Sequence, residues 1–261
     1  MGQHFLADEI VLQKIVGCAS PKPEETILEI GPGLGALTFE LSRRAGKVAA
    51  VEKDPVLCQY LKKEIQEKNL KNIYVTCGDI LKIPEEFFTA AVPYKVVASI
   101  PYYLTARLIR KLLSEVPAPN SLYLVIQKEV GERIIARSPH ANLLATSVQL
   151  YGNPRILLSI GRKAFWPEPE VDSVLIAIES ISKKTFESKR VSEELVFFLV
   201  RAGYHTRRKK LSSLLEEALT FPKSEIEGTL INLELRPDAR AEALSPDDWL
   251  RLASLLPPRK A

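Results

Sequence analysis

Thr26-Ile27-Leu28-Glu29-Ile30-Gly31-Pro32-Gly33-Leu34-Gly35 decides the fold of this 261-residue chain. The first five residues form a short, mainly apolar run, which predicts a buried β-strand. The glycines that follow permit a tight turn, and a helical pattern over 36–45 continues from that turn. A strand, a glycine-rich turn and a helix in this order are typical of a ligand-binding unit in an α/β protein.

Short apolar runs alternate with helical patterns along the first two thirds of the chain. Such alternation is typical of a mainly parallel sheet covered on both faces, so the predicted fold class is α/β. The last two predicted strands have no helix between them, and one of the two should therefore be antiparallel. The predicted strands are 26–30, 48–51, 73–76, 95–98, 122–126, 155–160 and 173–179; the predicted helices are 9–18, 36–45, 55–68, 104–115, 128–137 and 142–151.

The pattern changes after about residue 182. The charged stretch 182–190 reads as a linker, and the rest of the chain has only helical spacing. We therefore expect one domain over 1–182 and a small all-α domain over 183–261. The helices predicted for the second domain are 192–202, 206–219, 223–231 and 246–255.

Composition narrows the class of protein. The chain has 36 Lys and Arg against 32 Asp and Glu, which is ordinary for a globular protein. Cys18, Cys58 and Cys77 lack metal-ligand spacing, and so low and odd a count predicts a reducing cytosol, no disulfide framework and no metal site. No apolar run approaches the ~20 residues of a membrane span. We expect a cytoplasmic protein that does not act at a membrane.

Polar residues follow three of the predicted strands and indicate the cofactor. The loop reads G-x-G-x-G, with Glu29 just before it, whereas a dinucleotide loop reads G-x-G-x-x-G. An acidic neighbour suits the cationic S-adenosylmethionine better than it suits a pyrophosphate. Glu52 is placed to accept both ribose hydroxyls, and Asp79 to accept from the adenine amino group. Gly31 and Gly33 let the backbone approach the ligand closely.

The tetrapeptide Ser99-Ile100-Pro101-Tyr102 follows the fourth predicted strand and suits an exocyclic amine. The Ser99 hydroxyl and the Ile100 carbonyl can accept both hydrogens of an adenine N6 amine and favour a pyramidal nitrogen. Pro101 constrains the turn and has no competing N–H, while Tyr102 offers a stacking face. Phe165 can cover the second face of the base. Each feature alone also fits a turn packed against the core; together they favour methyl transfer to a base.

Basic residues cluster in two places and predict contacts with RNA phosphates. One pair lies on the helix after the tetrapeptide, and the other group precedes an apolar helical stripe in the second domain. Most such clusters are solvated faces, but the neighbouring base-handling turn favours phosphate binding. The residues are Arg107, Arg110, Arg207, Arg208, Lys209 and Lys210.

Six segments in order along the chain resemble the small-subunit ribosomal RNA adenine dimethyltransferases. Individually these motifs are weak to moderate signals, but their order and intervals are specific, and they cover nearly the whole length. The segments are GQHFL at 2–6, EIGPGLG at 29–35, QKEVGER at 127–133, AFWPEPEVDSV at 164–174, RRKKL at 207–211, and RP at 236–237 with LSP at 244–246.

The resemblance implies a Rossmann-like class I methyltransferase sheet that uses S-adenosylmethionine. It implies dimethylation of N6 on two adjacent adenines in the 3′-terminal hairpin of small-subunit (16S) rRNA, with that rRNA as partner; we expect a monomer. By matching positions, the resemblance adds His4, Leu6 and Ser99 to the cofactor contacts. It assigns Ser99, Ile100, Tyr102 and Phe165 to the acceptor base.

Serine at position 99 departs from the family, which usually has Asn there. A hydroxyl keeps one oxygen acceptor but is shorter, and a lost contact of this type costs about 1–3 kcal/mol, or roughly tenfold to a hundredfold in rate. Two alternatives therefore stay open: a large-subunit rRNA adenine methyltransferase, and a non-catalytic ribosome-assembly or RNA-binding factor. An NAD-dependent dehydrogenase is remote, because the glycine spacing differs and no catalytic histidine is evident.

Overall fold

The chain folds into two compact units. The structure is a computed structural model that describes residues 4–101, 104–206, 208–219 and 221–256. The first unit contains residues 1–131 and 153–181, and the second contains 132–152 and 182–261. Residues 132–152 thus group with the C-terminal part of the chain, although the expected boundary at 182 placed them in the first domain. The chain leaves the first unit before it adds the last two strands of the sheet.

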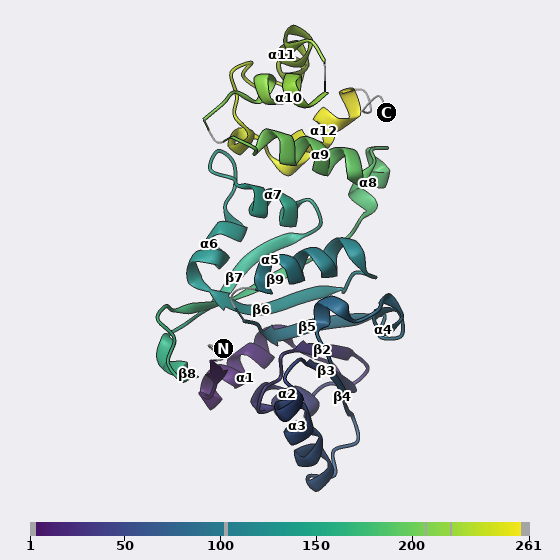
Figure 1. The fold of residues 1–261 in the computed structure, drawn as a ribbon, viewed down its shortest axis with the longest axis vertical. Coiled ribbons are helices and arrows are strands. Elements are labelled where there is room, and N and C mark those ends of the chain that lie inside the picture. The colour runs from purple at the N-terminus through teal and green to yellow at the C-terminus, as the bar shows by residue number, and fades with distance from the viewer. Residues whose placement is uncertain (1–3, 102–103, 207, 220, 257–261) are drawn as a thin grey trace. The chain divides into compact units, whose positions relative to one another are not determined.

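A seven-stranded sheet forms the centre of the first unit (Figure 1). The strand order is β4-β3-β2-β5-β6-β9-β7, and β9 runs antiparallel to both of its neighbours. The prediction of a mainly parallel α/β sheet in which one of the last two strands is antiparallel is confirmed. The strands are β2 (Thr26–Ile30), β3 (Lys47–Glu52), β4 (Ile73–Cys77), β5 (Tyr94–Ser99), β6 (Ser121–Gln127), β7 (Asn153–Ile160) and β9 (Ser173–Glu179).

Helices pack on this sheet because its strands alternate apolar side chains toward both faces. Ile27, Val48 and Val97 are fully buried in one core cluster with residues of α1 and α2. β1 (Phe5–Leu6) and β8 (Phe165–Trp166) pair antiparallel in a separate two-stranded ribbon. The helices are α1 (Glu9–Ala19), α2 (Ala36–Ser42), α3 (Pro55–Glu67), α4 (Glu85–Thr89), α5 (Thr105–Arg110) and α6 (Lys128–Ile135).

The helix predicted over 104–115 divides into two parts. The α-helical part, α5, ends at Arg110, and a π-helix, η3 (Lys111–Glu115), continues the chain. Lys111 begins the π-helical part and is only 8% exposed. Wider turns of this kind occur most often as local features near functional sites.

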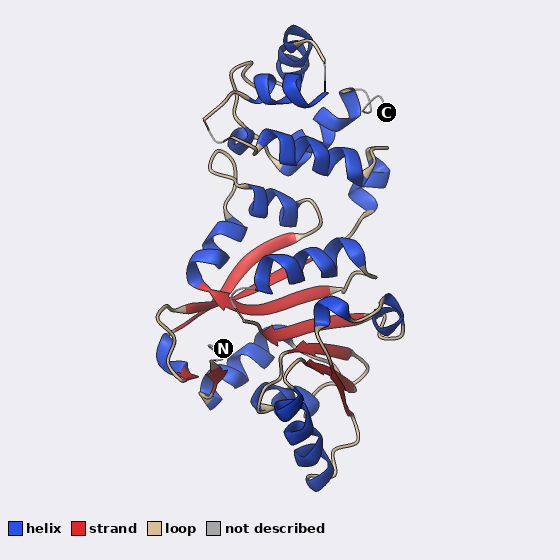
Figure 2. Cartoon of the chain, viewed as in Figure 1, coloured by secondary structure: helices blue, strands red, loops and turns tan. Residues whose placement is uncertain are grey.

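The second unit is all-helical in its described part, as Figure 2 shows by colour. Trp249 is completely buried and packs near Tyr204, and a capping box between Ser245 and Asp248 starts α12. None of the described helices of the chain is long and apolar enough to cross a membrane. The helices are α7 (Leu143–Gln149), α8 (Lys184–Ser188), α9 (Glu193–Gly203), α10 (Leu211–Leu219), α11 (Lys223–Asn232) and α12 (Pro246–Leu255).

Two sequence predictions for this unit are wrong in detail. The stretch 182–190 contains α8 and is not an open linker, because Phe186 is buried with its ring centroid 5.6 Å from that of Tyr151. The helix predicted from 206 begins at Leu211, whose backbone N–H donates to the Ala239 carbonyl at 2.9 Å. Both differences come from contacts distant in sequence.

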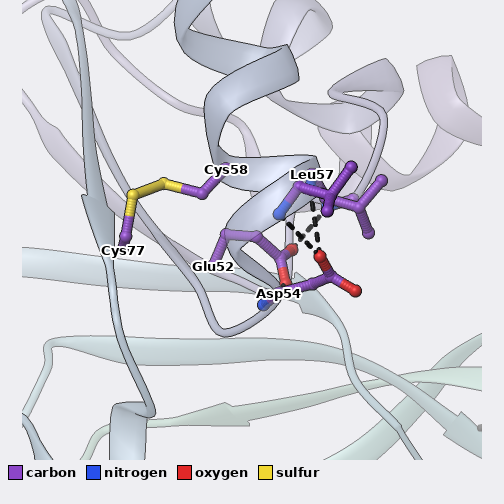
Figure 3. Close-up of a disulfide and its surroundings, with 7 residues drawn as sticks. Glu52, Asp54, Leu57, Cys58 and Cys77 are labelled. Atoms are coloured by element: carbon purple, nitrogen blue, oxygen red, sulfur yellow. Dashed lines mark hydrogen bonds between the residues drawn. A yellow bond between two sulfur atoms is a disulfide. The ribbon is translucent and has the colours of Figure 1, made fainter.

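The expectation of no disulfide is also wrong. Cys58 in α3 and Cys77 at the end of β4 form a disulfide across a Cα–Cα distance of 5.7 Å (Figure 3). The two cysteines are 19 residues apart and meet because α3 packs beside the strand that follows it. Cysteine spacing carries no signal for such a pair. The cysteine count therefore no longer supports a reducing compartment.

Candidate active site

A cavity of about 580 Å³ lies where the carboxyl ends of β2, β3, β4 and β5 meet. Ligands bind at this edge of open α/β sheets because loops and helix N-termini converge there. Ten of the residues predicted from the sequence line the cavity. They are His4, Gly31, Gly33, Glu52, Asp79, Ser99, Ile100, Pro101, Arg107 and Phe165.

The glycine loop forms one wall and needs glycine for its backbone. Gly31 has φ +70° and Gly33 has φ +57°, which are left-handed conformations that L side chains rarely adopt. A Cβ on Gly33 would lie 2.9 Å from the Phe5 ring, and one on Gly31 would lie 3.9 Å from the Ser99 carbonyl oxygen. The loop therefore forms an open cradle for a ligand, and a side chain at Gly31 or Gly33 would disturb it.

Glu52 anchors this cradle from the end of β3. Its carboxylate is 4% exposed and accepts from the Gly33 N–H at 3.0 Å and from the Asp54 N–H at 2.8 Å. Asp54 in turn caps α3 by accepting from the Val56 N–H at 2.8 Å. Figure 3 shows Glu52 and Asp54 together at the start of α3. Each carboxylate oxygen of Glu52 keeps a lone pair, which suits a ligand hydroxyl.

Asp79 follows β4 and forms the next part of the wall. One of its oxygens accepts from the Leu81 N–H at 3.0 Å, and the other pairs with the Lys53 ammonium at 3.0 Å. Partial burial opposes ionisation of Asp79, but Lys53 and the Leu81 N–H outweigh it and hold the pKa of this carboxyl below its usual value. Asp79 is therefore an ionised acceptor at neutral pH.

The turn at Ser99, Ile100 and Pro101, here named the acceptor turn, forms another wall of the cavity. The Ile100 N–H donates to the Val125 carbonyl at 3.3 Å, and the Leu104 N–H donates to the Pro101 carbonyl at 2.9 Å. These bonds hold Ser99 and Ile100 at the end of β5. Tyr102 lies outside the described residues. Phe165 is buried against the cavity at 6% exposure.

Trp166 and His4 are both close to Phe165, but only His4 lines the cavity. Trp166, next to Phe165, is 70% exposed and takes no part in lining the cavity. His4 lines the cavity, and its Nδ1 lies 2.7 Å from the Pro167 carbonyl oxygen. The N-terminal ribbon thus brings residues from both ends of the first unit to one site.

Glu29 lies under the loop and not in the cavity, so the expectation that its charge faces a bound cation is wrong. It is 2% exposed on the side of β2 opposite to Ile30, which lines the cavity. Burial, together with the nearby charge of Glu52, raises the pKa of Glu29 to about 8, although the Thr38 hydroxyl opposes the shift. Glu29 is mostly protonated at neutral pH.

Other predicted residues lie elsewhere. Leu6 is 7% exposed in the core cluster and does not line the cavity. Arg110 pairs with Glu115 at 3.1 Å, and Lys209 pairs with Glu217 at 2.9 Å. Arg207 lies outside the described residues. Arg208 and Lys210 line a second cavity, of about 560 Å³, within the C-terminal unit.

Several lining residues were missed by the sequence analysis. Most directly follow a predicted residue at a strand end, so extending each strand end by two or three positions would have found them. No group of three or more His, Cys, Asp or Glu side chains in the described ranges is arranged to hold a metal ion. The missed residues include Lys53, Ile80, Leu81, Lys82, Leu104 and Ser173.

The sheet order and this cavity define the class of protein: a class I methyltransferase fold of the α/β type. A 23S rRNA methyltransferase, ErmE, has the same fold, with a TM-score of 0.72 at 24% identity over 95% of this chain and 97% of that one. The acidic residues Glu52 and Asp79 and the glycine cradle fit a nucleoside with a cationic sulfur.

The family follows from sequence. The model of the family described as ribosomal RNA adenine dimethylase matches residues 1–257, and the chain belongs to this family. A ribosomal RNA small subunit methyltransferase A from Dehalococcoides mccartyi (strain CBDB1) is 42% identical over 97% of this chain and 86% of its own length. A dimethyladenosine transferase from Plasmodium falciparum has a TM-score of 0.80 at 27% identity, covering 95% of each chain. The cofactor is S-adenosylmethionine.

Proposed function

We propose that this chain dimethylates N6 of two adjacent adenines in the 3′-terminal hairpin of small-subunit rRNA, as an S-adenosylmethionine-dependent enzyme. One observation carries the proposal: the glycine cradle with Glu52 and the acceptor turn at Ser99 form walls of the same cavity. A methyl donor held by the first wall would face an amine held by the second. The names of the curated relatives support the small subunit as substrate.

The chain's own residues account for binding and orientation. Glu52 accepts the ribose hydroxyls, and Asp79 accepts from the adenine amino group of the cofactor. When bound, S-adenosylmethionine would supply an electrophilic methyl group to the N6 lone pair, with S-adenosylhomocysteine as the leaving group and the N6 proton released to water after transfer. The Ser99 hydroxyl and the Ile100 carbonyl accept the N6 hydrogens and favour a pyramidal nitrogen. Catalysis by these residues is mainly positioning, because none of them must take a proton before transfer.

Base and backbone contacts complete the substrate site in this proposal. Phe165 covers one face of the target base, and Tyr102 stacks on the other. Arg107 lines the cavity and is placed to meet a flanking phosphate. Arg110 and the segment 207–210 bind further phosphates, so that the first unit carries chemistry and the helical unit carries RNA binding.

A methylation assay tests the proposal directly. Small and large subunits that lack the modification are incubated with S-adenosylmethionine carrying a labelled methyl group, and label is mapped by nuclease digestion and primer extension. We expect label only in the terminal-hairpin adenines of the small-subunit rRNA, as dimethyladenosine. Label in the large subunit alone would favour the alternative substrate. Normal cofactor and subunit binding without label would favour a non-catalytic factor.

Oligomeric state and location are parts of the same proposal. We propose a monomer in the cytoplasm, where ribosomal subunits are assembled. Light scattering coupled to size-exclusion chromatography should give a mass near 29.2 kDa. A concentration-dependent mass near twice this value would contradict the monomer.

A further inference from the structure

Lys111 is the one strongly buried lysine among the described residues, with 8% exposure. Its ammonium donates to the Leu81 carbonyl at 3.2 Å and to the Ile83 carbonyl at 3.0 Å. The same nitrogen lies 5.4 Å from the centroid of the buried Phe88 ring. Two carbonyl dipoles and an aromatic face thus compensate a cation that has been removed from water.

The two carbonyls belong to the loop that forms the adenine side of the cavity. Asp79 caps the short 3₁₀ turn η1 (Ile80–Lys82), and the Ile83 N–H donates back to the Asp79 carbonyl at 3.1 Å. Leu81 and its two neighbours line the cavity. The last carbonyls of such a turn have no partner within it, and a lysine side chain can satisfy them.

Lys111 itself belongs to the acceptor side. It follows α5, whose first turn comes directly after the Ser99–Pro101 segment. Leu104, the N-cap of this helix, and Arg107 within it line the cavity. They lie seven and four residues before Lys111, on the same helix face. The change to a π-helix begins at Lys111, where its side chain is buried.

We propose that Lys111 is a positioning residue that ties the 79–83 loop to α5 and so sets the separation of the cofactor wall from the acceptor wall. The inference rests on the proposed function only in taking this cavity as the cofactor site. Without the ammonium, the Leu81 and Ile83 carbonyls lose a hydrogen-bond donor. The loop that carries Asp79 can then move away from the adenine of the bound cofactor.

The test compares Lys111→Met, which keeps the length and removes the donors, with Lys111→Arg, which keeps both charge and donors. Lys95→Met is the matched control. The Lys95 side chain is 16% exposed, pairs with Glu25 at 2.9 Å and donates to the Ala19 carbonyl at 3.4 Å, at the opposite end of β5 from the cavity. Cofactor affinity is measured by calorimetry with S-adenosylhomocysteine, and folding by urea unfolding.

We expect Lys111→Met to raise the Kd tenfold or more and to speed amide exchange over 79–83, with a larger change in KM for the cofactor than in kcat. Lys111→Arg should stay within threefold of the native Kd. Lys95→Met should lose stability but also keep its Kd within threefold. Equal weakening by Lys95→Met, or a native Kd in folded Lys111→Met, overturns the proposal.

Should Lys111→Met not fold, Lys111→Gln carries the same test, because its shorter amide cannot reach both carbonyls. A rise in Kd of at least threefold is expected, and a native Kd overturns the proposal. The Kd and amide-exchange readouts need no RNA, so they separate this inference from the proposed function. Failure of rRNA methylation with normal cofactor binding would contradict the function alone.

Discussion

Ser99 brings a short hydroxyl to the end of β5, where the amine of the target base would lie. Removing it in Ser99→Ala deletes one acceptor and should lower the rate of methyl transfer roughly tenfold to a hundredfold. Ser99→Asn should keep at least the native rate, because an amide oxygen reaches further from the same backbone. Single-turnover assays on small subunits measure both variants.

Cofactor binding provides the control for Ser99. The Kd of S-adenosylhomocysteine should change less than threefold in Ser99→Ala if the hydroxyl acts on the acceptor base. A large rise in this Kd with an unchanged single-turnover rate would contradict the assignment.

Glu29 makes stability depend on pH. Its folded pKa of about 8 exceeds the ordinary value of 4.5, so between these values the folded protein holds a proton that the unfolded chain has released. The free energy of unfolding should therefore fall as pH rises through this window, by about 1.4 kcal/mol per pH unit. Urea unfolding at pH 6, 7 and 8 measures the slope, and Glu29→Gln should remove this contribution.

An exposed glutamate controls for other titrating groups. Glu24 lies nearby in the sequence and is exposed, so Glu24→Gln should leave the pH slope as in the native protein. The burial argument fails if Glu29→Gln and the native protein show the same slope.

For single residues, the sequence correctly predicted which side chains line the cavity where a residue lies at the end of a strand or directly follows it. Glu52, Asp79 and Ser99 line the cavity as predicted, because parallel strands align their carboxyl ends. Leu6 faces the core instead, and Glu29 faces away from the cavity. Which face a residue takes depends on the neighbour that covers it, and one sequence does not contain that neighbour's place.

At the scale of helices and strands, the disulfide joins α3 to β4. It links two cysteines that are 19 residues apart in sequence and so closes a loop of that length. In unfolded, unreduced protein a thiol reagent should detect one thiol per chain, that of Cys18, and three after reduction. Loop closure of this length contributes about 3 kcal/mol, so reductant should lower the free energy of unfolding by about that amount.

Two variants sharpen the disulfide prediction. Cys18→Ser should keep the effect of reductant on stability, because Cys18 is the free cysteine of the described chain. Cys58→Ser with Cys77→Ser should lose that effect. Three reactive thiols in the unfolded, unreduced protein would contradict the bond.

Apolar periodicity did not predict every change in helix type. Apolar spacing predicted the strands and most helices, but α5 changes to a π-helix at Lys111. At this point the buried Lys111 ammonium donates to carbonyls 28 and 30 residues earlier in the chain. A helical pattern reports only neighbours within a few turns, so it cannot signal such a change.

For the whole molecule, charge distribution decides how RNA binding responds to salt. Arg208 and Lys210 line the second cavity, and neither forms an ion pair with a carboxylate of the described residues. The double variant Arg208→Gln/Lys210→Gln should bind small-subunit rRNA more weakly and reduce the slope of log K against log salt by about 1 to 2, since each phosphate contact contributes about 0.7–0.9. Filter binding at salt concentrations from about 50 to about 200 mM measures the slope of log K against log salt.

Lysines already paired with carboxylates provide the control for charge. Lys189 pairs with Asp247 at 2.8 Å and Lys223 with Glu227 at 3.9 Å. The double variant Lys189→Gln/Lys223→Gln removes the same formal charge and should leave the salt slope nearly native. Equal slopes for both double variants would indicate a general charge effect and contradict phosphate binding at the second cavity.

The sequence by itself determined the α/β alternation, the glycine loop and the acids at strand ends, because periodicity and glycine geometry are local properties of the chain. Only the tertiary structure decided the Cys58–Cys77 bond, the core position of Leu6 and the grouping of 132–152 with the helical unit. It alone joined Lys111 to the 79–83 loop. These features depend on which surfaces pack together. Packing brings together residues that are far apart in sequence, and a local sequence pattern carries no information about such contacts.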